Sequence, residues 1–182
     1  MIRFFDFLFS LIGLVFLSPL LIFIWFIILL DNGSPLFRQK RVGHNLQSFV
    51  LFKFRTMPIK TRSVGTHLIK DIKLTFFGFL IRSVKLDELP QLFNVLLGDM
   101  SLVGPRPCLL NQKKLINERK KRGIFKVKPG MTGLAQILDV NMETPVLLAK
   151  TDLKMINMFS LSDYFSYILK TILKISKLSN ER

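Results

Sequence analysis

The longest apolar run of the chain extends from Phe7 to Leu30 and carries no charged side chain. As a straight helix of about 24 residues it would measure roughly 36 Å, which is enough to cross the hydrocarbon core of a bilayer. The run is too long for the apolar region of a signal peptide, and no small-x-small cleavage site follows Leu30. We therefore predict a retained membrane anchor.

A Ser18-Pro19 pair interrupts this run near its middle. An interior proline removes one helical hydrogen bond and costs about 3 kcal/mol. Inserting the apolar residues contributes on the order of 10 kcal/mol, so the segment is expected to stay in the membrane and bend. Two topologies are compatible with a bend: a spanning helix that tolerates the proline, or a re-entrant hairpin that returns to the same face. In the hairpin, the Ser18 hydroxyl would bond a carbonyl that the break sets free.

The distribution of basic residues predicts which side of the membrane the remaining chain occupies. Only Arg3 and the amino terminus precede the apolar run, whereas Arg38, Lys40, Arg41, Lys53 and Arg55 follow it closely. The positive-inside rule places the body in the cytoplasm. Cys108 is the only cysteine, which agrees with a reducing compartment.

Hydrophobic and polar residues alternate from Gln47 to Met57, a pattern typical of a half-buried strand. Val50, Phe52 and Phe54 fall on one face, and Leu51, Lys53 and Arg55 on the other. The two basic side chains could simply be solvated or could bind an anion. Residues 60–71 follow without periodicity and are predicted to form a loop.

Helical patterns dominate the rest of the chain. Thr144-Pro145 is a typical helix start, and Ser162 or Asp163 is expected to begin the last helix. That helix has an apolar stripe of Phe165, Ile168, Leu169, Ile172 and Leu173, opposite Lys170, Lys174 and Lys177. The stripe would lie on an anionic membrane surface or pack against a core. The predicted fold class is α+β, predominantly helical, in a single membrane-associated domain with a small strand element and interfacial amphipathic helices.

Adjacent carboxylates, Asp87 and Glu88, lie between arginines in a chain of net charge +15. Asp87 could merely cap an amphipathic helix that has Pro90 in its first turn and ends at Gly98. A carboxylate pair in an excess of positive charge also suits chemistry on an anion.

Two further basic segments accompany the pair. In Gly104-Pro105-Arg106-Pro107 the prolines fix the backbone around Arg106, which lowers the entropy lost when the arginine holds a ligand. The alternative is a stiff turn with an exposed arginine. From Lys113 to Lys128 the chain is strongly basic, which is usual for a solvated face or for attraction to anionic headgroups.

These residues could carry out phosphoryl transfer at a membrane. Such transfer depends mainly on positioning and charge neutralisation, which Arg, Lys or a divalent cation provides. An aspartate can attack phosphorus to form an acyl phosphate, and a neighbouring glutamate can hold Mg²⁺ or manage a proton.

Ordered motif blocks along nearly the whole chain resemble the small monotopic phosphoglycosyl transferases, also called bacterial sugar transferases. The blocks are Arg3 with Asp6, Ser18-Pro19, Phe52-Lys53-Phe54-Arg55-Thr56-Met57, Arg82-Ser83, Asp87-Glu88-Leu89-Pro90-Gln91, Gly98-Asp99-Met100-Ser101-Leu102-Val103-Gly104-Pro105-Arg106-Pro107 and Lys128-Pro129-Gly130-Met131-Thr132-Gly133-Leu134-Ala135-Gln136. A lone Asp-Glu pair would be weak evidence, whereas this many blocks in order are strong evidence.

The resemblance implies a reaction and assigns roles in it. Asp87 would attack the β-phosphate of a UDP-sugar, release UMP and carry a covalent phosphosugar, which polyprenyl (undecaprenyl) phosphate would then accept. Glu88 would be the Mg²⁺ or proton-handling partner, and Asp87 with Glu88 the metal site. Arg82 and Arg106 would bind phosphates, with Lys53 and Arg55 as weaker candidates.

The resemblance also implies a place in the cell and an architecture. Residues 1–31 would form a re-entrant membrane helix broken at Ser18 and Pro19, and residues 32–182 a catalytic domain on the cytoplasmic face of the bacterial inner membrane. The product would begin a lipid-linked glycan such as an O-antigen, a capsule or a glycoprotein glycan. Membrane lipids and downstream glycosyltransferases would be partners.

The sequence departs from the commonest family pattern after Gln136, where the residues from Ile137 to Asn141 replace a segment that usually carries a glycine and an arginine. Met155 stands where many relatives have a tyrosine. The identity of the sugar is therefore left open. The rival function is a non-enzymatic, membrane-anchored basic module for anionic lipid or nucleic acid. Since no nucleic-acid fold signature is present, a nucleic-acid partner is not expected.

Overall fold

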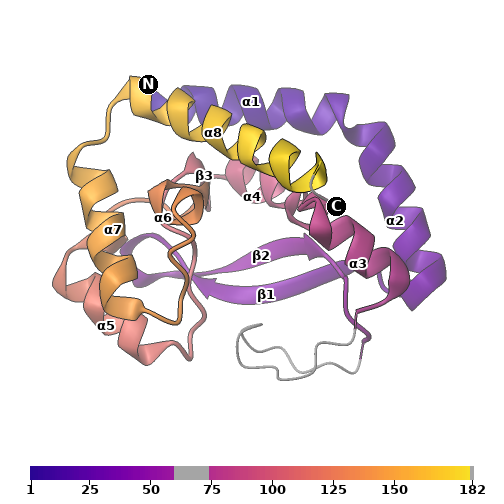
Figure 1. The fold of residues 1–182 in the computed structure, drawn as a ribbon, viewed down its shortest axis with the longest axis horizontal. Coiled ribbons are helices and arrows are strands. Elements are labelled where there is room, and N and C mark those ends of the chain that lie inside the picture. Colours follow the sequence, from indigo (N-terminus) through magenta and orange to yellow (C-terminus); the bar gives the residue numbers. More distant parts are fainter. Residues whose placement is uncertain (60–73, 181–182) are drawn as a thin grey trace.

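Most of the chain is helical in the computed structural model, which describes residues 1–59 and 74–180. The predicted loop at 60–71 lies outside these residues. The helices are α1 (Ile2–Phe16), α2 (Ser18–Asn32), α3 (Phe76–Ser83), α4 (Gln91–Leu97), α5 (Lys113–Lys121), α6 (Leu134–Ile137), α7 (Pro145–Asn157) and α8 (Leu161–Asn180). Short 3₁₀ turns are η1 (His44–Leu46), η3 (Leu86–Glu88) and η4 (Ile124–Lys126). Figure 1 shows α1 and α8 along one side of the molecule and a hairpin of two long β-strands near its centre.

Two small sheets complete the fold of the part of the chain that the structure describes. Strands β1 (Leu36–Val42) and β2 (Ser48–Phe54) pair antiparallel, and β3 (Ser101–Val103) pairs in parallel with β4 (Gly130–Thr132). The predicted class, α+β and predominantly helical, is confirmed at this level.

The strand β2 forms where the alternation predicts it, but its burial differs from the expectation of one buried face. Leu51 is 2% exposed and Val50 is 37% exposed. Leu51 packs in a cluster with Val95 of α4, whereas Phe54 packs on the other face in a cluster with Ile28 of α2. Since helices cover both faces of the strand, alternation alone cannot identify its buried side.

The apolar run breaks at the predicted place. Helices α1 and α2 meet at Leu17 with a bend of 63°. The Ser18 hydroxyl donates to the Val15 carbonyl at 2.7 Å, which confirms the predicted bond to a freed carbonyl. Among the described residues no single helix has the length and apolarity to cross a membrane, and only the bent pair taken together meets that test, on length and composition alone. The re-entrant topology thus stays a prediction.

The first turns of α1 are fastened to the body by charged side chains. The buried Asp6 carboxylate accepts hydrogen bonds from Ser101 Oγ (3.0 Å), Leu102 N (2.9 Å) and Tyr164 OH (2.9 Å). Arg3 donates to the carbonyls of Val95 (2.5 Å) and Leu96 (2.7 Å) in the last turn of α4, where carbonyls lack their usual helical partners. These contacts join α1 to β3, α4 and α8.

The last two helices nearly follow the sequence prediction. Thr144 occupies the N-cap position of α7 as expected, although its side chain makes no capping hydrogen bond. Helix α8 begins at Leu161, before the predicted Ser162 or Asp163. Ser160 precedes the helix, and its backbone N–H donates to the Asp163 carboxylate while its hydroxyl accepts from the Asp163 N–H. This reciprocal pair resembles a capping box, which fixes the start earlier.

The apolar side of α8 divides its residues between the core and the surface. Tyr164 is buried and Ile168 packs in the same cluster. Leu169 and Ile172 remain more than half exposed. The predicted core packing is therefore confirmed for Ile168, whereas contact of the exposed stripe residues with a membrane surface stays a prediction.

Candidate functional site

The carboxylate pair lies in a tight turn ahead of α4. The alternative in which Asp87 merely caps the helix is wrong, because α4 begins only at Gln91, with Pro90 in the cap position. Pro90 has no N–H to close an α-helical turn. The hydrogen bonds before it have the shorter 3₁₀ pattern, from Glu88 N to Lys85 O and from Leu89 N to Leu86 O, each 3.2 Å.

Three separate parts of the chain meet at Glu88. Lys53 Nζ of β2 lies 2.7 Å from Glu88 Oε1, and Arg106 Nη2 of the Gly-Pro-Arg-Pro loop lies 2.5 Å from the same oxygen. Lys53 Nζ is also 3.9 Å from Asp87 Oδ2. The structure thus brings together Lys53, Asp87, Glu88 and Arg106, as the sequence predicts.

The environment drives the pKa values of the two carboxyl groups apart. Burial raises the pKa of Asp87, against the smaller opposing effect of Lys53. Burial also acts to raise the pKa of Glu88, but Arg106 and Lys53 together overcome it and hold that pKa well below its usual range. Glu88 in turn raises the pKa of Arg106. Glu88 is therefore expected to be ionised at neutral pH, whereas Asp87 binds a proton more readily than an ordinary aspartate.

A polar cavity of about 440 Å³ opens beside the pair. Its cationic lining comprises Arg41, Lys53, Arg82, Lys85 and Arg106. Gln136 of α6 and Asn141 and Glu143 of the segment before α7 also line it, and Asn141 belongs to the stretch in which the chain departs from the family pattern. A cavity with these walls suits an anionic, hydroxyl-rich ligand.

Arg41 is a cavity residue that the sequence argument did not single out. Its guanidinium donates to Pro107 O at 3.0 Å and to Gln39 Oε1 at 2.6 Å. Burial and the neighbouring Arg106 lower the pKa of Arg41 to about 10. The sequence signal that could have identified Arg41 is its place among the basic residues after the anchor. Those residues were interpreted only as evidence for membrane topology.

Arg55 does not join the cavity lining. Its Nε donates to Ser34 O at 3.1 Å, and its guanidinium lies over the ring of Phe37 at 5.4 Å from the centroid. Lys53 and Arg55 would share a face in a longer strand, but β2 ends at Phe54. Ser18 and Pro19 also lie outside this cavity, at the helix break.

A buried ion pair between α5 and α7 holds the backbone of the Arg106 loop. Arg119 and Asp152 have side chains only 2% and 1% exposed, and Arg119 Nη2 lies 2.8 Å from Asp152 Oδ2. Arg119 Nη1 donates to the backbone carbonyl of Arg106 at 2.7 Å. The basic pattern of this stretch predicts a solvated face or a headgroup-binding surface, and for the buried Arg119 that prediction is wrong.

The two carboxylates are the candidate metal ligands. Among residues 1–59 and 74–180 no group of three or more His, Cys, Asp or Glu side chains is arranged to hold a metal ion. Mg²⁺ in phosphate sites is commonly bound by one or two carboxylates together with phosphates and water, so the pair fits that donor set. Lys53 and Arg106 already bind one oxygen of Glu88, so the ion would use the remaining carboxylate oxygens or compete with these cations.

The carboxylate pair, its cations and the cavity define a class of enzyme site suited to phosphate-bearing substrates. The family model described as "Bacterial sugar transferase" matches residues 1–178. The chain therefore belongs to the bacterial sugar transferase family, which makes it an enzyme and confirms the family resemblance.

Relatives include sugar transferase EpsL of Bacillus subtilis, 46% identical over 71% of this chain and 66% of that protein. The undecaprenyl-phosphate galactose phosphotransferase of Salmonella typhimurium is 38% identical over 79% of the chain and 34% of its own length. The UDP-glucose:undecaprenyl-phosphate glucose-1-phosphate transferase of Xanthomonas campestris is 39% identical over 78% and 31%, respectively. The match thus spans two thirds of the first protein and about a third of the other two.

Proposed function

We propose that the protein transfers a sugar 1-phosphate from a UDP-sugar to polyprenyl phosphate, as a first membrane step of glycan assembly. The observation that carries the proposal is the contact of Lys53 and Arg106 with Glu88 beside the buried Asp87. The names of the Salmonella and Xanthomonas relatives, which specify undecaprenyl phosphate and sugar-phosphate transfer, support the choice of substrates.

The reaction would run in two displacements at one phosphorus atom. A carboxylate oxygen of Asp87 attacks the β-phosphorus of the UDP-sugar, the bond to the bridging oxygen breaks, and UMP leaves with the bond electrons. The sugar phosphate is then joined to Asp87 as an acyl phosphate. A phosphate oxygen of the polyprenyl phosphate attacks the same phosphorus, which restores the Asp87 carboxylate and forms a polyprenyl diphosphate sugar.

The surrounding charges explain how an anion can attack an anion. Glu88 stays ionised and fixes Lys53 and Arg106 at the site, so their positive charge is in place before substrate binds. Arg82 and Arg41 line the same cavity and would bind the diphosphate. Burial of Asp87 removes water from its carboxylate, which leaves it more reactive once it is ionised.

Mg²⁺ is the cofactor that the proposal includes. Held by Asp87 and Glu88, it would neutralise charge on the diphosphate and on the departing UMP. Lys53 and Arg106 would orient Glu88 for this role.

The protein would act at the bacterial inner membrane, with its body on the cytoplasmic face. Its exposed apolar surface supports association with a membrane. Exposed large apolar side chains occur on α1, α2, α3 and α8, among them Phe7, Val15, Phe23, Phe26, Phe79, Leu80, Leu169 and Ile172. Exposed apolar side chains in this number, on helices close to the predicted anchor, are typical of a membrane or protein interface. Together with the bend at Leu17, they favour the re-entrant hairpin over a straight span.

The function is tested by incubating the full chain with polyprenyl phosphate, Mg²⁺ and a panel of UDP-sugars, and measuring UMP release. We expect one or more sugars to react, and Asp87→Asn to reduce that rate roughly a thousandfold or more. Asp31→Asn, at an exposed position near the end of α2, should retain full activity. A reactive sugar with UMP release unaltered by Asp87→Asn would rule out the covalent mechanism.

A further inference from the structure

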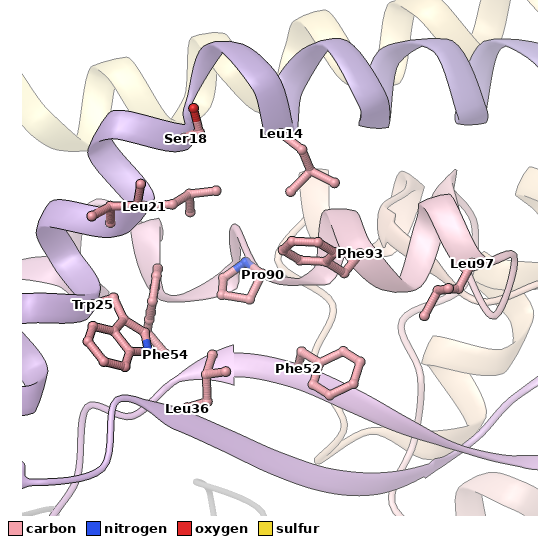
Figure 2. A pocket seen from close by; sticks show the side chains of 11 residues that line it. Leu14, Ser18, Leu21, Trp25, Leu36, Phe52, Phe54, Pro90, Phe93 and Leu97 are labelled. Atoms are coloured by element: carbon pink, nitrogen blue, oxygen red, sulfur yellow. The ribbon is translucent and has the colours of Figure 1, made fainter.

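A second cavity, of about 510 Å³, lies between the bent helix pair and the β1–β2 hairpin. Figure 2 shows Leu14, Leu21 and Trp25 from the helices facing Phe52 and Phe54 of β2 and Phe93 of α4. Its volume lies in the range of ligand sites.

The walls of this cavity select for hydrocarbon. Among the described residues that line it, Ser18 is the one that bears a hydroxyl, and this hydroxyl already donates to Val15 O. A sugar or nucleotide placed here would lose hydrogen bonds to water without replacing them. An aliphatic or isoprenoid chain needs none, and burying its surface is favourable.

The apolar cavity shares its walls with the polar site. Lys53 lines the polar cavity, whereas its neighbours Phe52 and Phe54 line the apolar one. Glu88 lines the polar cavity, and Pro90 lines the apolar one two residues later. Since consecutive Cα atoms are about 3.8 Å apart, one amphiphile could place its headgroup on one side and its chain on the other.

We propose that the apolar cavity binds the isoprenoid chain of the acceptor while the phosphate of the acceptor reaches Asp87. This rests on the proposed function, because that function supplies an acceptor with both parts. The Ser18-Pro19 break then has a second role besides topology. By turning α2 away from α1, it places residues of both helices around one hydrocarbon chain.

The chain contains its own reporter for this binding. Trp25 is the only tryptophan and lines the cavity. Undecaprenyl phosphate added to the full-length protein in phosphatidylcholine nanodiscs should shift the Trp25 emission in a saturable way. Phosphatidic acid at the same mole fraction should not, although it also carries a phosphate monoester. An equal response to phosphatidic acid, or none to undecaprenyl phosphate, would overturn the proposal, and the first result would mean that a bilayer acyl chain occupies the cavity.

A pair of substitutions in α2 tests the same site by kinetics. Ile22 lines the cavity and Leu20 does not, although both are surface residues of one helical turn. Ile22→Trp should raise the KM for undecaprenyl phosphate about tenfold, because loss of even two buried methylene groups has that effect. The KM for the UDP-sugar should stay unchanged. Leu20→Trp should leave both constants unchanged, and an equal KM increase in the two variants would contradict the assignment.

The two proposals fail in different ways. Turnover without a Trp25 response, or without a selective effect of Ile22→Trp, would reject the acceptor site and keep the transferase function. A selective Trp25 response to undecaprenyl phosphate without turnover on any UDP-sugar would support the site and count against the transferase function.

Discussion

At the scale of single residues, the site depends on the different electrostatic environments of neighbouring carboxyl groups. Glu88 binds two cations and stays ionised, whereas burial raises the pKa of Asp87. Groups whose pKa values are driven apart in this way are typical of acid, base and nucleophile assignments. Asp87 must be ionised to attack, so its protonation should lower the rate at acidic pH.

Substitution of Lys53 tests this electrostatic argument. Lys53 is the strongest influence that lowers the Asp87 pKa, so Lys53→Met should raise that pKa further. Because the ionised form of Asp87 attacks, the acidic limb of the pH profile for UMP release should move to higher pH. The measurement is kcat/KM for the UDP-sugar against pH. Lys40→Met, at an exposed site in β1, should leave the limb in place, and a limb that moves to lower pH in Lys53→Met would contradict the argument.

Substitution of Arg119 tests the buried ion pair. Arg119→Met leaves the Asp152 carboxylate buried without its partner, which should cost about 3–5 kcal/mol of unfolding free energy. It also removes the hydrogen bond to the carbonyl of Arg106. Denaturation of the detergent-solubilised protein measures the loss. Lys121→Met, on the exposed side of the same helix, should change stability by less than about 0.5 kcal/mol, and equal stability of the two variants would refute a structural role for the pair.

The sequence was sufficient to predict which charged residues meet around Glu88, because those residues occur in recognisable blocks. It was not sufficient for Arg119, whose basic neighbours on α5 are solvated. A single buried arginine has no periodicity of its own, and its partner Asp152 lies on another helix. The prediction that Arg55 binds phosphate has a different weakness. Its motif block matched the family, but β2 ends at Phe54, one residue before Arg55, and the Arg55 side chain does not line the polar cavity.

At the scale of secondary-structure elements, the break between α1 and α2 was predictable and the fastening of α1 was only partly so. The Ser18-Pro19 signal is local, and the structure places the bend there. Arg3 and Asp6 were recognised as a motif, but their partners lie on α4, β3 and α8, which sequence spacing does not reveal. Helices α4 and α8 start at other residues than predicted, because Pro90 and Ser160 determine the hydrogen bonds at the two helix starts. Residue type alone did not show which of several candidate residues would do so.

The fastening of α1 makes a testable contribution to stability. Asp6→Leu would leave the Ser101 hydroxyl, the Leu102 N–H and the Tyr164 hydroxyl without their acceptor. At about 1–3 kcal/mol for each buried unsatisfied group, the unfolding free energy should fall by about 3 kcal/mol or more. Urea or thermal denaturation in detergent measures this loss. Asp31→Leu, exposed near the end of α2, is the matched control, and an equal effect of both substitutions would contradict the anchoring role.

At the scale of the whole molecule, the apolar exterior and the polar site are parts of one arrangement. The bent pair and α8 present apolar residues outward. The carboxylate pair shares the polar cavity with Lys53 of β2, and the neighbouring residues of the same strand line the apolar cavity. A re-entrant hairpin predicts that the start of α1 and the surface of the body lie on the same side of the membrane.

Labelling of introduced cysteines tests this topology. In a Cys108→Ala background, Phe4→Cys and Lys121→Cys are both at exposed positions. A membrane-impermeant maleimide added to spheroplasts should label neither variant until the cells are lysed. Labelling of Phe4→Cys in intact spheroplasts would establish a spanning helix instead of a hairpin.

The covalent intermediate on Asp87 is the central claim, and mass spectrometry of the protein tests it most directly. With a UDP-sugar that supports turnover, but without polyprenyl phosphate, the intact protein should gain the mass of one sugar phosphate. Fragmentation should place that mass on Asp87, the adduct should disappear when polyprenyl phosphate is added, and Asp87→Asn should form none. An adduct on another residue would contradict the account. So would the absence of any adduct with a UDP-sugar that is turned over when polyprenyl phosphate is present.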